Sequence, residues 1–109
     1  MSKQYWLSVI IPTYNGSKYL ADALNSVVVQ QDQDIECVVI DDGSTDDTLS
    51  IVESYQSKLN IRLITKARAG NWVVNTNHAL TVATGKYACF LHQDDLWLDG
   101  RLQNIKNAI

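Results

Sequence analysis

The sequence is poor in cysteine and proline, with two cysteines and a single proline among 109 residues. Cys37 and Cys89 both lie inside apolar runs. We therefore expect both thiols to be buried as small hydrophobic groups in a reduced compartment, rather than to form a disulfide or a metal site. No set of cysteines and histidines has the spacing of a zinc site, which excludes that class.

Long apolar stretches are also absent. No run approaches the ~20 residues that a membrane-spanning helix needs. Residues 1–6 lead directly into a short apolar run and do not resemble a signal peptide. We expect a cytoplasmic protein, associated with a membrane only through a part that this sequence lacks. The formal charge of −3 argues against nucleic acid as a partner.

Two common nucleotide-binding motifs are missing too. No G-x-G-x-x-G follows the first apolar run, which argues against a dinucleotide oxidoreductase, and no G-x-x-x-x-G-K-[ST] is present, which excludes a P-loop. The composition, 46% apolar and 19% charged, is that of a globular protein. Its length predicts one domain, residues 1–109.

Four short apolar runs alternate with segments of helical periodicity. The runs lie at residues 7–11, 35–40, 61–64 and 87–91. Three of them are nearly continuous in apolar residues, as in strands that are covered on both faces. Helices are expected at 20–28 (capped by Gly16 or Ser17), 49–59, 73–83 and from about residue 100. The five glycines and the proline fall at the joins. This order predicts a doubly wound α/β fold with a mostly parallel sheet.

Polar segments follow three of these strands. We expect the first strand to be central, with the second and third on one side and the fourth on the other. Residues 12–15, 41–44 and 92–95 would then share one edge of the sheet, where such folds bind ligands. Adjacent acids in two of the segments, at 41–42 and 94–95, repel each other and are tolerated most easily where a cation or a ligand donor compensates.

Nucleotide chemistry fits this edge. Asp94 and Asp95 offer the carboxylates that Mg²⁺ or Mn²⁺ takes together with phosphates. Asp41 or Asp42 is placed to accept from a ribose or a base. Tyr14 offers a stacking face, and Thr13 and Asn15 offer hydrogen-bonding groups. The pattern indicates a nucleotide whose diphosphate is neutralised by a metal.

Four motifs carry a resemblance to a known family. Residues 8–16, 38–48, 83–87 and 91–95 resemble, in order and spacing, the N-terminal half of family 2 glycosyltransferases with the GT-A fold. The resemblance implies a Rossmann-like, nucleotide-sugar-binding half without the acceptor side. It also implies inverting transfer of a sugar from a nucleotide-diphosphate donor to a hydroxyl of a saccharide or lipid-linked acceptor, as in polysaccharide biosynthesis, with Mn²⁺ or Mg²⁺.

The resemblance also assigns roles to residues. It implies that the base is bordered by Pro12, Thr13 and Tyr14, with Asn15 beside them. It also implies that Asp42 accepts a hydrogen bond from the base or the ribose, while Asp41 supports the loop. Asn77 would be the asparagine that the family has before the fourth strand, and Asp94 and Asp95 would hold the metal and the diphosphate. His92 stands where the family often has an acid, and a neutral imidazole can ligate a metal.

Several expectations complete this reading. The catalytic base of the family lies well downstream, so we expect it beyond Ile109. Trp97 could face a donor sugar, whereas we expect Trp72 to pack in the core and Lys66 and Arg68 to lie in a solvated loop. A truncated half would expose surface that invites self-association.

Three alternatives remain. The chain could bind nucleotide without any activity of its own. A receiver-like signalling module needs acids after the first and third strands, where Pro12-Thr13 and Thr65-Lys66 stand. A sugar-phosphate nucleotidyltransferase needs a glycine-rich basic loop that residues 13–18 do not supply.

Overall fold

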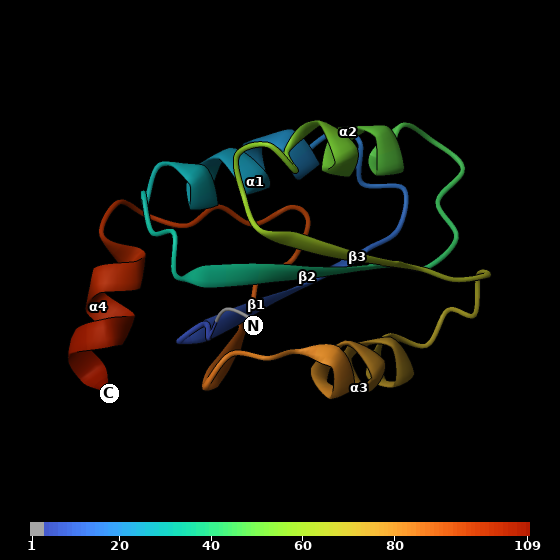
Figure 1. Cartoon of the computed structure of the whole chain (residues 1–109). Helices are drawn as coiled ribbons and strands as arrows, with labels where there is room; N and C mark the ends of the chain where they lie inside the picture. Colours follow the sequence, from blue (N-terminus) through green and yellow to red (C-terminus); the bar gives the residue numbers. More distant parts are fainter. Residues whose placement is uncertain (1–3) are drawn as a thin grey trace.

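The computed structural model describes residues 4–109, in which four parallel strands alternate with four helices (Figure 1). The order in the sheet is β3-β2-β1-β4. This confirms the α/β class and the central place of the first strand. The elements are β1 (Leu7–Thr13), α1 (Leu20–Val28), β2 (Ile35–Asp41), α2 (Thr48–Ser54), β3 (Ile61–Thr65), α3 (Trp72–Val82), β4 (Tyr87–Phe90) and α4 (Arg101–Ala108).

Helices cover both faces of the sheet, with α1 and α2 on one face and α3 on the other (Figure 1). Alternate residues of β1 serve the two faces: Leu7, Val9 and Ile11 belong to the larger core cluster, on the side of α1 and α2. Ile10 belongs to a smaller cluster with Val38, Ile40 and Ala79 of α3. The α3 face therefore has much less apolar packing.

Most boundaries agree with the predicted ones. Three features differ: α2 ends at Ser54 rather than at residue 59, β1 is longer than predicted, and α1 lacks the predicted cap. Strand β1 continues through Pro12 to Thr13, because β4 pairs only with the residues up to Ile10, so the missing N–H of Pro12 costs no sheet hydrogen bond. Helix α1 has no side-chain cap. Instead, the Gly16 carbonyl accepts from the backbone N–H groups of Tyr19 and Leu20.

Trp97 corrects one prediction. It does not face a sugar, since only 9% of its surface is exposed and it belongs to the larger core cluster. Its backbone N–H donates to Ser26 Oγ of α1 at 3.0 Å, which fixes the segment before α4.

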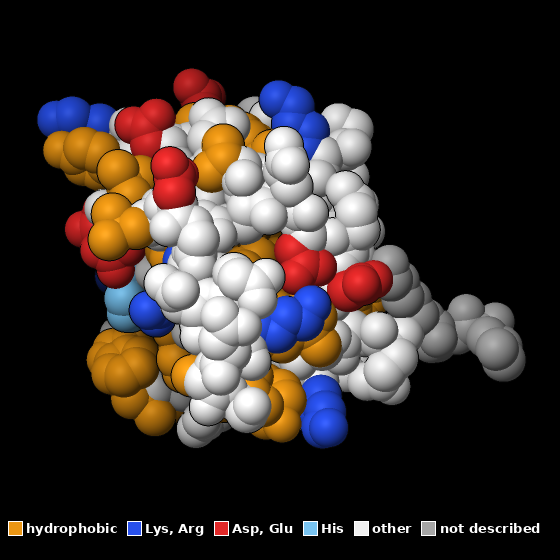
Figure 2. All heavy atoms as spheres, turned by 90° about the vertical axis from the view of Figure 1, so that its left-hand side faces the viewer, with side chains coloured by type: hydrophobic (Ala, Val, Ile, Leu, Met, Phe, Trp, Pro, Cys, Tyr) orange, Lys and Arg blue, Asp and Glu red, His pale blue; other side chains and the backbone are white. Residues whose placement is uncertain are grey.

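Both cysteines are free; Cys37 is buried, as the sequence predicts, whereas Cys89 is only partly buried. Burial raises the pKa of Cys37 to about 12 and that of Cys89 to about 11, so both are protonated thiols at neutral pH. Among residues 4–109, no helix combines the length and the apolar character that crossing a membrane requires. Seen from the end that carries α4, the molecule shows acidic and basic side chains interspersed (Figure 2).

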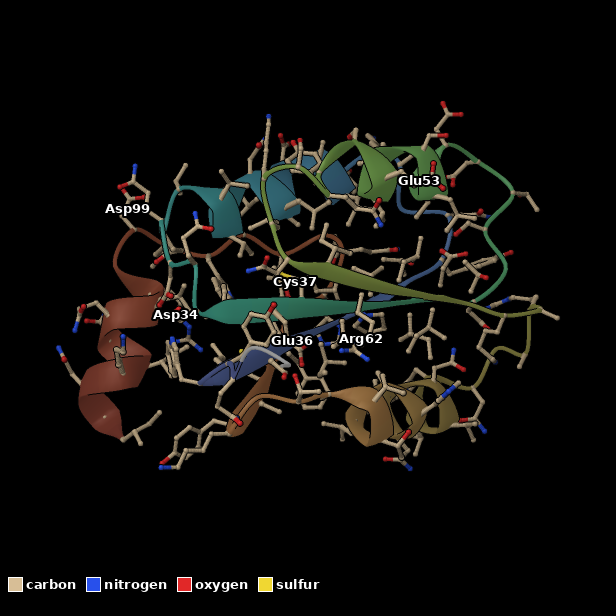
Figure 3. All side chains as sticks on the ribbon, viewed as in Figure 1. Asp34, Glu36, Cys37, Glu53, Arg62 and Asp99 are labelled. Carbon is tan, nitrogen blue, oxygen red and sulfur yellow. The ribbon has the colours of Figure 1, made fainter. Side chains whose placement is uncertain are left out.

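A buried carboxylate lies on the α3 side of the sheet. Glu36 of β2 is 3% exposed and its Oε2 accepts from Ser8 Oγ at 2.6 Å and from the Thr84 backbone N–H at 2.6 Å. Arg62 of β3 approaches the other oxygen at 3.8 Å (Figure 3). Burial alone would raise the pKa of Glu36, but these hydrogen bonds outweigh it and the pKa lies below its ordinary value of 4.5.

We predict that Glu36→Ala lowers the free energy of unfolding by about 3 kcal/mol at pH 7, because Ser8 Oγ and the Thr84 N–H lose their buried acceptor. The lowered pKa means that ionised Glu36 stabilises the fold above the unfolded-state pKa, and that this contribution disappears as the pH falls through the folded-state pKa. Urea unfolding followed by circular dichroism at pH 3 to 7 measures both effects.

The matched control is Glu53→Ala, an exposed acid of α2 that Figure 3 places far from Glu36. It should change the free energy of unfolding by less than about 0.5 kcal/mol. Equal losses in the two variants, or a Glu36→Ala protein whose stability depends on pH as steeply as the wild type, would contradict the prediction.

Candidate functional site

A cavity of about 660 Å³ lies at the carboxyl ends of β1, β2 and β4. This is the point in a doubly wound sheet where successive connections run to opposite sides, and where ligands bind. The wall combines residues that follow each of these strands with the first turns of α3. They are Pro12, Thr13, Tyr14, Asp42, Arg68, Gly70, Trp72, Asn75, Thr76, Phe90, His92, Gln93 and Asp94.

Hydrogen bonds join the loop after β1 to the loop after β2. The Asn15 backbone N–H donates to Ser44 Oγ at 2.9 Å, and Asn15 Oδ1 accepts from the Thr45 backbone N–H at 2.8 Å. Asn15 has a positive φ of 46°, a conformation that asparagine tolerates better than most residues. Asn15 therefore ties the loops together and is absent from the cavity wall.

Gln93 makes the equivalent link between the loops after β1 and β4. Its Oε1 accepts from the Tyr14 backbone N–H at 2.8 Å, and its Nε2 donates to the Tyr14 carbonyl at 3.0 Å. This pair of hydrogen bonds fixes the backbone that carries the Tyr14 ring. Sequence reasoning placed Gln93 at this edge but gave it no role.

The first acid pair is divided between two functions in the structure. Asp41 points into the loop after β2, where it accepts from Thr13 Oγ1 at 2.7 Å and from Ser44 Oγ and N at 2.6 and 2.8 Å. It does not line the cavity. Asp42 does, although it is only 4% exposed.

Asp42 binds the segment between β3 and α3. Its carboxylate accepts from the backbone N–H groups of Ala69 and Gly70 at 3.0 and 2.9 Å, and pairs with Lys66 and Arg68. The Ala69 N–H lowers the pKa of Asp42 most; burial opposes it, and the Gly70 and Arg68 donors outweigh burial, so the carboxylate is ionised. Lys66 and Arg68, which were expected in a solvated basic loop, therefore pair with a buried acid, although half of the Arg68 side chain is exposed.

Flat groups stack at the mouth of this cavity. The Arg68 guanidinium lies 3.7 Å from the centre of the Tyr14 ring, within the range of a cation–π contact. Gly43 allows this approach: it has a φ of 80°, and a Cβ at this position would lie 2.7 Å from the Arg68 backbone nitrogen.

Helix α3 supplies a wall that the sequence did not reveal. Asn71 caps the helix by accepting from the Val74 N–H at 3.1 Å, and this start directs Trp72, Asn75 and Thr76 to the cavity. Trp72 is 65% exposed, so its expected place in the core is wrong. Asn77 is exposed and lies outside the cavity wall. The spacing of i, i+3 and i+4 from Trp72 is the signal that could have found Asn75 and Thr76.

The second acid pair differs from the first in being exposed. Asp94 and His92 line the cavity, whereas Asp95 does not. The Asp95 backbone N–H donates to the His92 carbonyl at 3.0 Å, which closes a tight turn. Within the described residues, no three or more His, Cys, Asp or Glu side chains form a group that could hold a metal ion by themselves. Mg²⁺ and Mn²⁺ are commonly held by one or two carboxylates when phosphates supply other ligands, and Asp94 fits that donor set.

Comparisons with known proteins agree with this geometry. The model of glycosyl transferase family 2 matches residues 8–109. An uncharacterized glycosyltransferase of Nostoc sp. is 40% identical over 101 residues, which cover 91% of this chain and 31% of the relative.

Two solved structures extend the comparison. Staphylococcus aureus TarS in complex with UDP-GlcNAc matches with a TM-score of 0.88 and 38% identity, over 93% of this chain and 30% of that chain. A Pyrobaculum calidifontis mannosyltransferase in complex with GDP-Man and Mn²⁺ matches with a TM-score of 0.82 and 30% identity, over 91% and 30%. The chain thus spans less than a third of the length of each of these three proteins.

We predict that Asp42→Asn loosens the segment between β3 and α3. A neutral amide offers one acceptor where the carboxylate offers two, so the Ala69 and Gly70 N–H groups and the nearby cations lose partners. The free energy of unfolding should fall by about 2 kcal/mol, and hydrogen exchange at Ala69 and Gly70 should accelerate more than at β1 amides.

The control is Asp47→Asn, the same change at an exposed position whose side chain does not cap α2. Native-state hydrogen exchange by NMR compares the variants. Unchanged protection of the Ala69 and Gly70 amides in Asp42→Asn would show that the carboxylate does not hold this segment.

Proposed function

The chain belongs to glycosyl transferase family 2, as its motifs predict, and on this premise we propose that residues 1–109 form the nucleotide-sugar-binding domain of an inverting glycosyltransferase. The enzyme transfers a sugar from a nucleotide-diphosphate donor to the hydroxyl of a saccharide or lipid-linked acceptor. The observation that carries the proposal is the convergence of Tyr14, Asp42 and Asp94 on one cavity.

Each of these residues has a chemical role in the proposal. The Tyr14 side offers a flat surface for the base, with Pro12 and Thr13 beside it. Asp42 holds the segment that closes the base side of the cavity. Asp94 lies in the loop that follows β4, where the diphosphate would sit. The complexes of the two related structures with UDP-GlcNAc and with GDP-Man support a sugar nucleotide as the ligand.

The proposal includes a divalent cation. Asp94 would hold it together with the phosphates, with Asp95 and His92 next in the same turn. When bound, Mn²⁺ or Mg²⁺ neutralises the charge that grows on the departing diphosphate. The related mannosyltransferase contains Mn²⁺. A single exposed carboxylate in the cavity suits an ion that exchanges with each donor, because the phosphates complete its coordination.

Transfer then proceeds as one displacement. The acceptor oxygen bonds to the anomeric carbon of the donor sugar while the bond from that carbon to the diphosphate oxygen breaks, so the configuration inverts. The acceptor loses its proton to a general base. In this proposal the base lies outside the 109 residues, as the resemblance implies, and the contribution of this chain is to bind and orient the donor.

We predict that the chain binds UDP or GDP more tightly with Mn²⁺ than without it, and that Asp94→Ala weakens binding by tenfold or more. The expected loss corresponds to one charge-assisted contact, about 1.5–3 kcal/mol. Isothermal titration calorimetry with and without Mn²⁺ measures it. Because binding rather than turnover is measured, the test does not depend on the general base.

Asp99→Ala is the matched control, since Asp99 is exposed and lies beside α4, away from the cavity (Figure 3). It should bind as the wild type does. Absence of nucleoside diphosphate binding would contradict the proposed function. Binding that is equal with and without Mn²⁺, and equal in Asp94→Ala, would contradict the role given to Asp94.

A further inference from the structure

One buried side-chain atom in the cavity wall has no hydrogen-bond partner. Asn75 is 4% exposed and lines the cavity. Its side-chain amide lies beside the Asp42 carboxylate and helps to hold the pKa of that acid below its ordinary value. Asn75 Oδ1 is the one buried side-chain nitrogen or oxygen without a hydrogen-bond partner among residues 4–109. Such an atom destabilises the free protein, so a ligand that donates a hydrogen bond to it gains affinity.

Packing does not account for an asparagine here. Its neighbours on the same face of α3, Trp72 and Thr76, are otherwise satisfied: Thr76 Oγ1 donates to the Trp72 carbonyl at 2.9 Å, and the Trp72 ring is largely exposed. A leucine has the same branching as asparagine and no polar atoms, so an apolar side chain in this wall would leave no unpaired acceptor. The unpaired oxygen therefore points to a partner that arrives from outside the chain.

The partner must be a hydrogen-bond donor. Phosphate oxygens at neutral pH are acceptors, so the diphosphate is excluded, whereas the N–H groups of a nucleobase are donors. The neighbouring acid has little capacity left, because Asp42 already receives two backbone N–H groups and two cations. Oδ1 of Asn75 is thus the buried acceptor in this wall that remains available.

We propose that Asn75 reads the base of the nucleotide, with Oδ1 accepting an N–H of the base. The inference rests on the proposed function and adds a specificity-determining residue to it. A base is favoured over a ribose hydroxyl because flat groups, the Tyr14 ring and the Arg68 guanidinium, stack in the same cavity. A base whose N–H reaches Oδ1 donates a hydrogen bond to this acceptor. A base that presents a ring nitrogen or a carbonyl there leaves Oδ1 buried without a hydrogen bond, so it binds more weakly.

The experiment titrates the 109-residue chain, in the presence of Mn²⁺, with UDP, GDP, ADP, CDP and inorganic pyrophosphate, using NMR so that weak binding is measured. The variants are Asn75→Leu and Asn75→Ala. We expect a spread of at least about tenfold among the four nucleotides in the wild type. In both variants the preferred nucleotide should bind about tenfold more weakly and the spread should fall below about threefold. Pyrophosphate affinity should stay unchanged.

Thermal unfolding separates this role from a structural one. Both variants remove an unpaired buried acceptor, and Asp42 keeps its two backbone N–H groups and two cations, so the unfolding midpoints should stay close to that of the wild type. Asn104→Ala, the same change at an exposed position of α4, is the control for substitution of an asparagine in a helix. If one Asn75 variant fails to fold, the other carries the test, and a wild-type spread below threefold overturns the inference without any variant.

The remaining outcomes are distinguishable. A wild type that binds none of the four nucleotides overturns this inference and the proposed function together. Binding that is unchanged in the Asn75 variants overturns the inference alone. An equal loss for all four nucleotides assigns Oδ1 to the ribose and overturns the role in base recognition. A loss in Asn77→Ala that is absent in Asn75→Ala overturns it in favour of the residue that the family resemblance implies.

Discussion

The carboxylate of Asp42 is the contact on which the site depends. It gathers two consecutive backbone N–H groups and two basic side chains from the segment that follows β3. That segment ends at Asn71, which caps α3 directly afterwards. The rotation of α3 about its own axis is therefore set where the segment meets Asp42. Trp72 and Asn75 face the cavity as a consequence of that start.

The two acid pairs show how the same residues can serve different purposes. Asp41 and Asp42 are adjacent and buried, a costly arrangement unless each is neutralised separately. Asp41 is satisfied by hydroxyls and an amide of its own loops, and Asp42 by amides and cations from a distant segment. Both carboxylates are therefore largely occupied by contacts within the protein. Asp94 and Asp95 are exposed, so they keep the capacity to meet a ligand.

The sequence predicted the sheet well and the helical wall of the site poorly. Strand order and the shared edge follow from apolar runs and glycine positions, which are local signals. The wall depends on the rotation of α3, and three consecutive apolar residues at 72–74 define no single buried face. Arg68 was missed because its partner is 26 residues away, and pairing over such a distance leaves no trace in periodicity. The places of Trp72 and Trp97 were predicted wrongly for related reasons. Trp72 depends on the rotation of α3, and Trp97 is held by Ser26, which lies 71 residues away.

Strand β2 also carries the buried acid Glu36, and Glu36 and Asp42 together explain how α3 is held. Asp42 binds the segment that precedes α3, at Ala69 and Gly70, and Glu36 binds Thr84 just after it. The apolar cluster beneath the helix is small, so hydrophobic burial contributes less here than on the opposite face. Hydrogen bonds at both ends fix the position and rotation of a helix more closely than a small apolar contact surface does. A wall that must present one amide oxygen at a defined place is better built in this way, because hydrogen bonds specify the rotation of the helix as well as its position.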